Sequence, residues 1–360
     1  MARVIGIDPG TISIDICGLD DGRLFLDECL PTAEALRDPA AFVRRVKAAG
    51  RIDLVAGPSG YGLPCLRGDQ VTDRDLRLAV LAAEGESGGI GGLRALMRTL
   101  AGSGLPVVFT PGVIHLPSVP AHRKVNRIDM GTADKVCAAV LAIREQAARR
   151  RCRFDETAFV LVELGGAFTA AISVSGGRIV DGVGGSSGPL GRRASGALDG
   201  EIAFLAGRVS KSMIFAGGVA SIGGEADVES LVTSPLPQRR LAWAAYAEGA
   251  VKAVAALRTS APDAREVILS GRVARVAGVR DELARRIVAI ARGVTVELLR
   301  GSTSLATQAA EGAAVLADGL AGGVHAPLVD LLGIRQSHGT VLDHLYVISR
   351  QQAQHALGIT

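Results

Sequence analysis

An acid followed by a glycine turn comes directly after the first apolar stretch of the chain. Asp8 ends the apolar residues 4–7, and Gly10 and Thr11 complete the turn. Backbone N–H groups beside a glycine can approach an anion without a side chain in the way, and a carboxylate here can hold Mg²⁺ through water. The pattern predicts a phosphate-binding turn with Asp8 as the metal residue. A common Asp-Pro-Gly turn without a ligand is the alternative.

A second turn of the same kind follows about 155 residues later. Glu163 ends another apolar stretch and is followed, after Leu164, by Gly165 and Gly166. Two such turns on two lobes could clamp a polyphosphate from opposite sides, with magnesium between phosphates and protein. The repeat therefore favours a site that binds a nucleoside triphosphate over a common turn without a ligand.

Two further glycine-containing segments are candidates for the same ligand. Gly184, Gly185 and Ser186 lie in a polar loop that could contact phosphate or substrate, with a flexible surface loop as the alternative. Gly271 and Arg272 follow a buried strand and lead into a helix, the arrangement in which the base and ribose of a nucleotide lie at a helix N-terminus.

Charged residues gather before one predicted helix. Arg127 and Lys135 could neutralise a transferring phosphoryl group, and Asp129 could orient an acceptor. A solvated helix start capped by Thr132 is the competing explanation. The six histidines have neither metal-ligand spacing nor a partner serine in a nucleophile elbow, and no P-loop signature occurs, so these patterns give no support to a zinc enzyme or a serine hydrolase.

The elements that must position these residues occur twice. Apolar strands are predicted at 4–8, 12–18 and 23–26, and again at 159–166, 167–174 and 178–181. Between and after these two meanders, strands alternate with helices, which indicates an α/β fold. We expect two duplicated lobes with a cleft between them.

The remaining segments complete this α/β plan. Further strands are predicted at 54–56, 107–109 and 266–269, and helices at 93–100, from 132 to about 150, at 240–258, at 280–291 and at 305–320, with a glycine-rich connection at 85–92. The basic run 149–153 marks the boundary. The predicted units are residues 1–153, residues 154–324 and a C-terminal segment 325–360 that could cross back to the first lobe.

Composition limits the classes of partner. The 360 residues include 48% apolar and only 3% aromatic side chains, and the net charge is +4. Few aromatics and a mild charge argue against nucleic acid as a partner. Five cysteines without a CxxC pair fit a reducing cytoplasm, and no apolar run is long enough for a membrane span. We expect a cytoplasmic protein that binds neither membrane nor nucleic acid.

Together these motifs resemble the acetate and sugar kinase, heat-shock chaperone and actin (ASKHA) superfamily. Residues 7–11 look like its first phosphate motif, residues 163–166 like the second and residues 269–272 like the adenosine motif. Within it, residues 162–166 and 177–181, with Gly188-Pro189 and Ser195-Gly196, are similar to the butyrate kinase branch, above all to predicted butyrate kinases. The resemblance covers most of the chain and implies two ribonuclease-H-like lobes with a nucleotide cleft.

The resemblance implies phosphoryl transfer from ATP, with Mg²⁺, to a short-chain carboxylate, which yields an acyl phosphate. A carboxylate acceptor needs no general base, so Arg127 and Lys135 would matter most, whereas a hydroxyl acceptor would need Asp129 as the base. An enzyme that uses the phosphate to drive a biosynthetic condensation and a non-catalytic nucleotide-dependent regulator stay open as alternatives. Related kinases are often dimers, so a homodimer is expected.

The chain departs from the pattern of the acetate and butyrate kinases at three places. Those kinases have an asparagine where Asp8 stands. They carry an arginine before a Gly-Gly pair near the cleft, where this chain has residues 57–62 and Arg67 as the nearest arginine. Arg272 stands where the adenosine motif usually has a second glycine.

Overall fold

A computed structural model describes residues 2–57, 59–81, 89–224 and 227–359 of the chain. Half of the glycine-rich connection predicted at 85–92, namely residues 85–88, lies outside the described residues. Within the described part, none of the helices combines the length and the apolar character that a membrane crossing requires.

The first sheet has six strands in the order β3-β2-β1-β4-β6-β5. Strands β1, β2 and β3 form an antiparallel meander, β4 runs parallel to β1, and β6 runs parallel to β4. The bounds are β1 Arg3–Pro9, β2 Ser13–Asp20, β3 Arg23–Pro31, β4 Leu54–Gly57, β5 Leu66–Arg67 and β6 Val107–Phe109. The predicted strands of this lobe are confirmed.

The second sheet repeats this order with five strands, β11-β10-β7-β8-β9. Its meander β7-β8-β9 corresponds to β1-β2-β3, and the parallel strands β10 and β11 correspond to β4 and β6. The bounds are β7 Phe159–Leu164, β8 Thr169–Ser175, β9 Arg178–Val183, β10 Glu266–Ser270 and β11 Thr295–Leu298. The duplicated meander and the two-lobed α/β fold are confirmed.

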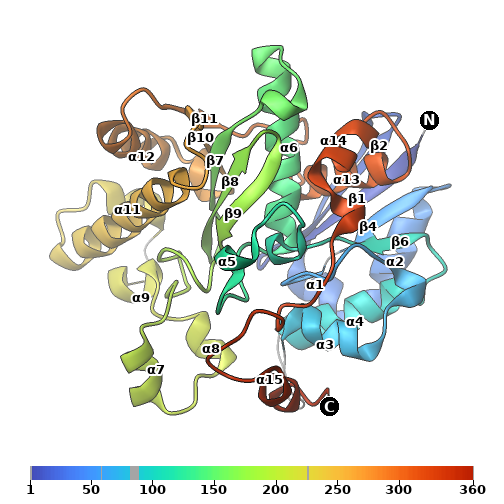
Figure 1. Ribbon diagram of the computed structural model, residues 1–360, viewed down its shortest axis with the longest axis horizontal. Coiled ribbons are helices and arrows are strands. Elements are labelled where there is room, and N and C mark those ends of the chain that lie inside the picture. The colour runs from blue at the N-terminus through green and yellow to red at the C-terminus, as the bar shows by residue number, and fades with distance from the viewer. Residues whose placement is uncertain (1, 58, 82–88, 225–226, 360) are drawn as a thin grey trace.

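Helices α6 and α13 lie between the sheets, and two groups of helices cover the outer faces (Figure 1). Helices α6 and α13 share the central core with the inner faces of both sheets. Helices α2, α3 and α4 cover the outer face of the first sheet, and α10, α11 and α12 cover that of the second. These helices are α2 Pro39–Ala48, α3 Asp73–Val80, α4 Gly89–Ala101, α6 Ala133–Arg150, α10 Val228–Val232, α11 Pro237–Arg258, α12 Ala277–Ile290 and α13 Gln308–Leu320.

Burial on both faces explains why the strands are almost uniformly apolar. In β1, Val4 belongs to the central core, whereas Ile5 and Ile7 belong to the outer core of the same sheet. Alternate residues of a strand point to opposite faces, so a sheet covered on both sides needs apolar residues at successive positions. The apolar runs that mark the strands in the sequence are a consequence of this layering.

Glycines let helix α13 approach its neighbours closely. A Cβ atom on Gly6 of β1 would lie 2.1 Å from the backbone nitrogen of Ala314, and one on Gly312 would lie 1.9 Å from the carbonyl oxygen of Cys137 in α6. No side chain fits at either place. The small residues of α13 therefore fix its distance from both β1 and α6.

Helix α13 belongs to the range 154–324 in sequence but packs against strands β1, β2 and β4 of the first sheet. The return to the first lobe thus begins before residue 325. The C-terminal segment then continues along that lobe: the Arg77 side chain of α3 donates to the carbonyl oxygen of Leu357 at 3.1 Å, and the Cys65 backbone N–H donates to the Ser337 hydroxyl at 2.7 Å. This segment contains α14 Ala326–Leu332 and α15 Arg350–Ala356.

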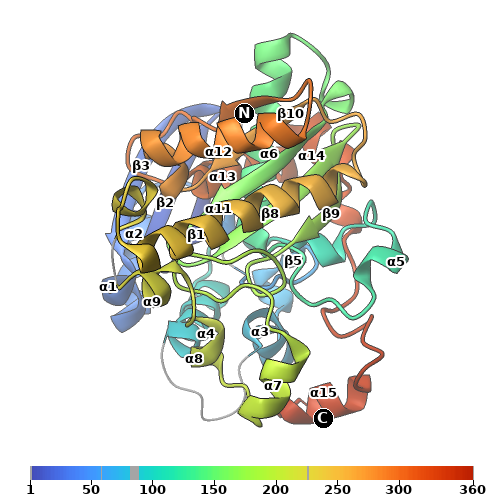
Figure 2. The same cartoon turned by 90° about the vertical axis from the view of Figure 1, so that its left-hand side faces the viewer.

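An insertion of short helices separates β9 from α11 in the second lobe. It contains α7 Gly200–Ala206, α8 Lys211–Ile214 and α9 Val219–Gly223. Figures 1 and 2 place α7 and α8 at the same end of the molecule as α3 and α15. These helices, and α1 Thr32–Arg37, α2 and α3 of the first lobe, were not predicted from the sequence.

Candidate active site

One cavity of about 620 Å³ lies between the two lobes. Its walls include Asp8, Gly10 and Thr11 from the turn between β1 and β2, and Glu163, Gly165 and Gly166 from the equivalent turn between β7 and β8. A Cβ atom on Gly166 would lie 3.0 Å from Cδ1 of Ile12, so the two turns approach each other directly. The two copies of the motif face one shared space.

Each turn is tight because a glycine lies close to the backbone of the returning strand. A Cβ atom on Gly10 would lie 2.8 Å from the carbonyl oxygen of Ser13, and one on Gly165 would lie 2.9 Å from that of Phe168. The Gly165 N–H also donates to the Phe168 carbonyl at 3.0 Å. The same local geometry therefore recurs at equivalent places in both sheets.

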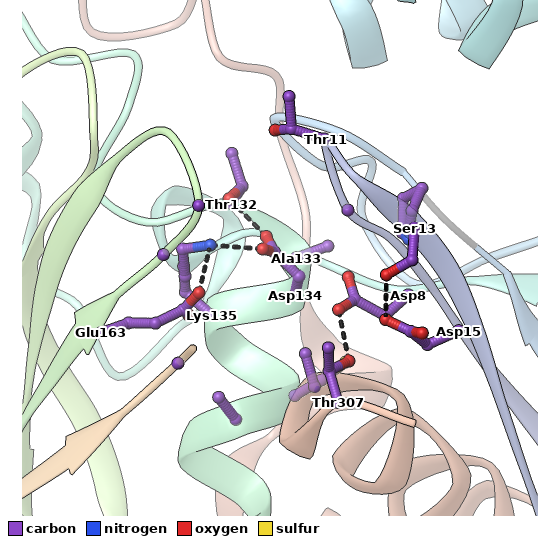
Figure 3. A pocket seen from close by; sticks show the side chains of 18 of the residues that line it. Asp8, Thr11, Ser13, Asp15, Thr132, Ala133, Asp134, Lys135, Glu163 and Thr307 are labelled. Carbon is purple, nitrogen blue, oxygen red and sulfur yellow. Dashed lines mark hydrogen bonds and ion pairs between the residues drawn. The ribbon is translucent and has the colours of Figure 1, made fainter. Parts of the chain in front are cut away.

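A buried group of acids and one lysine forms the floor between the turns (Figure 3). Oδ2 of Asp8 accepts a hydrogen bond of 2.6 Å from the hydroxyl of Thr307, the residue before α13. Lys135, in the first turn of α6, pairs with Oε1 of Glu163 at 3.0 Å and also with Asp134. Residues from β1, β7, α6 and the start of α13 thus meet at one point.

Burial and mutual repulsion shift the protonation of these groups. Burial, followed by the charge of Asp134, raises the pKa of Asp8 to about 8, although the Thr307 hydrogen bond and Lys135 oppose the shift. Burial also raises the pKa of Glu163. The attraction of Asp134 and Glu163 outweighs burial and raises the pKa of Lys135, while Lys135 keeps the pKa of Asp134 low. Lys135 therefore stays charged, whereas burial and the neighbouring acids make Asp8 hold a proton below about pH 8.

This donor set fits a magnesium ion that keeps most of its water. Asp8, Asp134 and Glu163 carry more negative charge than Lys135 balances, and Oε2 of Glu163 is buried without a hydrogen-bond partner. Among the described residues, no group of three or more His, Cys, Asp or Glu side chains is arranged to hold a metal ion. Mg²⁺ commonly binds through one or two carboxylates, water and substrate phosphates, so few direct ligands are needed.

Asp129 lies at the cavity wall and holds a glycine-rich loop of the other lobe. Its Oδ2 accepts hydrogen bonds from the backbone N–H of Ser186 at 2.9 Å and from the Ser186 hydroxyl at 2.8 Å, and its Oδ1 accepts one from the Gly131 N–H at 3.2 Å. A Cβ atom on Gly184 would lie 1.6 Å from Oδ1 of Asp129. Gly184 is therefore needed for this contact between segments.

Gly271 and Arg272 lie on the opposite wall, after β10. Gly271 has φ +88°, and a Cβ atom on it would lie 2.4 Å from the carbonyl oxygen of Leu164. Arg272 reaches across the cavity to the first lobe, where its Nη2 donates to the Ser13 hydroxyl at 2.7 Å. The adenosine-motif candidate Arg272 thus contacts the start of β2, just after the first phosphate-motif candidate.

The structure does not bring all predicted site residues to the cavity. Asp8, Gly10, Thr11, Asp129, Lys135, Gly165, Gly166, Gly185, Gly271 and Arg272 line it. Gly184 and Ser186 pack behind the wall against Asp129. Arg127 is exposed and outside the lining, because it lies before the turn that carries Asp129 inward. Arg67 is also outside and pairs with Asp69 on the surface at 3.1 Å.

Several cavity residues were not predicted as site residues. Asp134 precedes Lys135 in the sequence, and Glu163 begins the second phosphate-motif candidate. Their negative charge within or beside predicted motifs was the signal that could have identified them as site residues. Thr307 precedes an alanine-rich helix and has the sequence appearance of an N-cap, a role that it also fills by accepting from the Ala310 N–H. Asp15, inside a buried strand, is completely buried, and a carboxylate in such a place requires a partner or a function.

Several solved kinase structures have a fold similar to that of this chain. The chain is similar to a propionate kinase from Francisella tularensis, with a TM-score of 0.62 and 11% identity over 87% of this chain and 99% of that one. It is similar to acetate kinase from Entamoeba histolytica, with a TM-score of 0.59 and 9% identity over 80% and 86% of the two chains. ROK hexokinase from Thermus thermophilus has a TM-score of 0.50 and 18% identity over 88% and 98%. The expected ASKHA-type fold is confirmed.

A family model matches residues 6–347, and the chain belongs to that family, which is described as "Protein of unknown function (DUF1464)". No curated protein matches the sequence. The family match does not confirm the narrower resemblance to butyrate kinases.

Proposed function

We propose that this protein transfers the terminal phosphoryl group of ATP, bound with Mg²⁺, to a small-molecule acceptor. One observation carries the proposal: two topologically equivalent turns from two sheets line a single cavity between the lobes. The kinase structures of the same fold support this reading. Lining both sides of a polyphosphate with backbone N–H groups positions it while the lobes exclude water.

Each residue of the floor has a role in this proposal. The turns at Gly10–Thr11 and Gly165–Gly166 would hold the phosphate chain, and Asp8 would orient the water shell of Mg²⁺, with Thr307 fixing the rotamer of Asp8. Bound magnesium would neutralise charge on the phosphates. Lys135, held by Asp134 and Glu163, keeps the pKa of Asp134 low and supplies positive charge beneath the phosphates.

The resemblance implies a short-chain carboxylate as the acceptor, and the propionate and acetate kinase structures support this choice. Aromatic and aliphatic side chains line part of the cavity, among them Tyr61, Val80, Phe168 and Phe215. Such a wall suits the apolar body of a small acyl group. The reaction would give ADP and an acyl phosphate.

A hydroxyl-bearing acceptor is the second candidate, and the charge of the cavity favours it. Among the described lining residues, the carboxylates Asp8, Asp15, Asp129, Asp134 and Glu163 outnumber the cations Lys135, Arg272 and Arg275. An anionic acceptor would have to enter against this excess, whereas a neutral one would not. Among the described residues, Oδ1 of Asp129 accepts a hydrogen bond from the Gly131 N–H alone, so it keeps a lone pair for a substrate hydroxyl.

The test is ATP turnover with panels of small carboxylates and small alcohols, with hydroxylamine present to trap acyl phosphate. Hydroxamate together with ADP supports the carboxylate acceptor. ADP formation that a neutral alcohol stimulates, without hydroxamate, supports the hydroxyl acceptor. ATP binding with no acceptor-stimulated turnover in either panel would contradict phosphoryl transfer and favour a nucleotide-dependent regulator.

A further inference from the structure

One polar chain crosses the cavity from the second lobe to the first. Nη2 of Arg272 donates to Oγ of Ser13 at 2.7 Å, and Oγ of Ser13 donates to Oδ2 of Asp15 at 2.9 Å. Ser13 and Asp15 begin β2, directly after the turn that carries Gly10 and Thr11. The guanidinium of Arg272 is therefore held beside the first phosphate-motif candidate although it comes from the adenosine-motif candidate.

Asp15 is a buried acid that the proposed reaction does not use. Its side chain is 0% exposed, it lines the cavity, and its Oδ1 is buried without a hydrogen-bond partner. In the β1-β2 ladder Asp15 stands directly opposite Asp8, so both side chains are on the same face of the sheet. Two carboxylates opposite each other repel, and a nearby cation lowers that cost. Asp15 therefore attracts the Arg272 guanidinium to this side of the cavity.

Arg272 keeps its positive charge available. Across the described part of the chain, Lys135 is paired with two carboxylates, whereas Arg272 forms no ion pair with a carboxylate and contacts the neutral Ser13 hydroxyl and the Cys29 thiol. A guanidinium has five N–H donors, so donors remain for an anion in the cavity. Gly271 has a positive φ, and the backbone turn at this residue sets the position of the Arg272 Cα atom, from which the side chain extends.

From this geometry we infer that Arg272 binds the phosphate chain of the nucleotide, and that Ser13 and Asp15 are positioning residues that hold its guanidinium over the Gly10–Thr11 turn. The inference rests on the proposed nucleotide site. It assigns to the second lobe a cation that contacts phosphate, so that the bound triphosphate connects the lobes electrostatically. If the guanidinium stacked on the base instead, the substitution of Arg272 would weaken adenosine and ATP equally.

The test compares calorimetric affinities for ATP, ADP, AMP and adenosine between the unsubstituted protein, Arg272→Gln and the control Arg275→Gln. Arg275 lines the same wall and has no hydrogen bond or ion pair to the first lobe among the described residues. We expect Arg272→Gln to weaken ATP and ADP about tenfold to hundredfold and to leave adenosine unchanged, as for a lost charge-assisted hydrogen bond. Arg275→Gln should not weaken ligands in proportion to their phosphates.

Equal weakening of adenosine and ATP by Arg272→Gln would overturn the inference, because it would indicate a contact with the base. So would an effect on ATP no larger than that of Arg275→Gln. Absence of ATP binding to the unsubstituted protein would instead overturn the proposed function itself, and this inference with it. The two failures are therefore distinguishable in one set of titrations.

The positioning role is tested by a double-mutant cycle. Ser13→Ala and Asp15→Asn should each weaken ATP about threefold to tenfold in the unsubstituted protein and have little further effect in the Arg272→Gln background. Ser13→Ala removes one hydroxyl and serves as the variant that keeps the buried acid if Asp15→Asn fails to fold. Independent effects in the two backgrounds would show that Ser13 and Asp15 do not act through Arg272.

Discussion

At the scale of single residues, repulsion between closely spaced carboxylates destabilises the folded protein at the site. Asp8 is 6% exposed, stands opposite Asp15 in the β1-β2 ladder and lies near Asp134, and its pKa is raised to about 8. Such acids destabilise a fold while they prepare a site for a cation. A conservative substitution at Asp8 should separate these two effects.

We expect Asp8→Asn to lower turnover and to stabilise the ligand-free protein. A folded-state pKa above the unfolded value of 3.8 means that Asp8 favours folding at low pH and that this contribution is lost as the pH rises toward 8. Asparagine does not ionise and still accepts from Thr307. The gain in unfolding free energy should grow between pH 5 and pH 8 and reach at least about 1 kcal/mol, since one pKa unit corresponds to about 1.4 kcal/mol.

Urea denaturation at both pH values measures this gain, with Asp69→Asn as the control. Asp69 forms a surface pair with Arg67, and such pairs contribute little. A gain that is the same at pH 5 and pH 8 would contradict the raised pKa of Asp8.

His115 has the opposite titration behaviour. It is 1% exposed, its Nδ1 has no hydrogen-bond partner, and burial lowers its pKa to about 4. Because the unfolded chain binds this proton near pH 6.5 and the folded chain does not, stability falls as the pH drops from 6.5 to 4. The loss from this residue is at most about 3 kcal/mol.

The variant His115→Gln should therefore lose less stability than the unsubstituted protein over that interval. The measurement is the unfolding free energy of both proteins at pH 6.5 and pH 4.5. Parallel curves for the two proteins would show that His115 is not the group responsible.

At the scale of elements, close packing of helices decides the geometry of the floor. Thr307 and Lys135 belong to the N-terminal ends of α13 and α6, and these helices touch at Gly312. Their mutual distance therefore sets the distance between the Thr307–Asp8 pair and the Lys135–Glu163 pair. Glycine at this helix position is a requirement of packing.

Gly312→Ala should destabilise the protein by about 2 kcal/mol, even though alanine normally favours a helix over glycine by about 1 kcal/mol. The added Cβ would lie 1.9 Å from the Cys137 carbonyl oxygen. Gly278→Ala in α12 is the matched control, because its Cβ would meet nothing within 4 Å and should stabilise slightly. Thermal unfolding of both variants gives the comparison, and a stabilised Gly312→Ala would contradict the packing described here.

The elements that could be predicted from the sequence share one property: the pattern that marks each of them lies within its own residues. The meanders, β4, β6, β10, α6 and α11 are each marked by an apolar run, a glycine turn or helical spacing. The packing of α13 on the first sheet and on α6 depends on contacts with residues 6 and 137, which no local pattern of α13 contains. The same holds for the site: Asp8 and the glycines could be found as motifs, whereas the Asp8–Thr307 and Arg272–Ser13 contacts join residues that are 299 and 259 positions apart.

At the scale of the whole molecule, a few side chains join the two lobes across the cavity, in addition to the core around α6 and α13. Ile12 against Gly166 and Arg272 against Ser13 are contacts across the cavity. Cys29 of β3 is exposed and lines the same space, so its thiol reports on what occupies the cavity. The hydrogen bond to Asp15 and partial burial raise the pKa of this thiol, which slows its reaction at neutral pH.

ATP with magnesium should protect Cys29 from a thiol reagent. Cys65 and Cys152, which are half-buried and outside the cavity lining, should react equally with and without nucleotide, while the buried Cys17 and Cys137 should stay unreactive. Mass-spectrometric mapping of labelled cysteines gives the result, with Cys29→Ser as the control. Labelling of Cys29 that is unaffected by saturating ATP would place the nucleotide elsewhere.

The position of α13 also has a consequence for how the protein is made. The nascent chain completes the first sheet early, but the helix that covers its inner face leaves the ribosome only after the entire second sheet has been synthesised. Until then the inner side chains of β1, β2 and β4 have no permanent cover. The first half of this polypeptide is therefore expected to depend on the second for its final folding step, and the halves should not survive as separately expressed fragments.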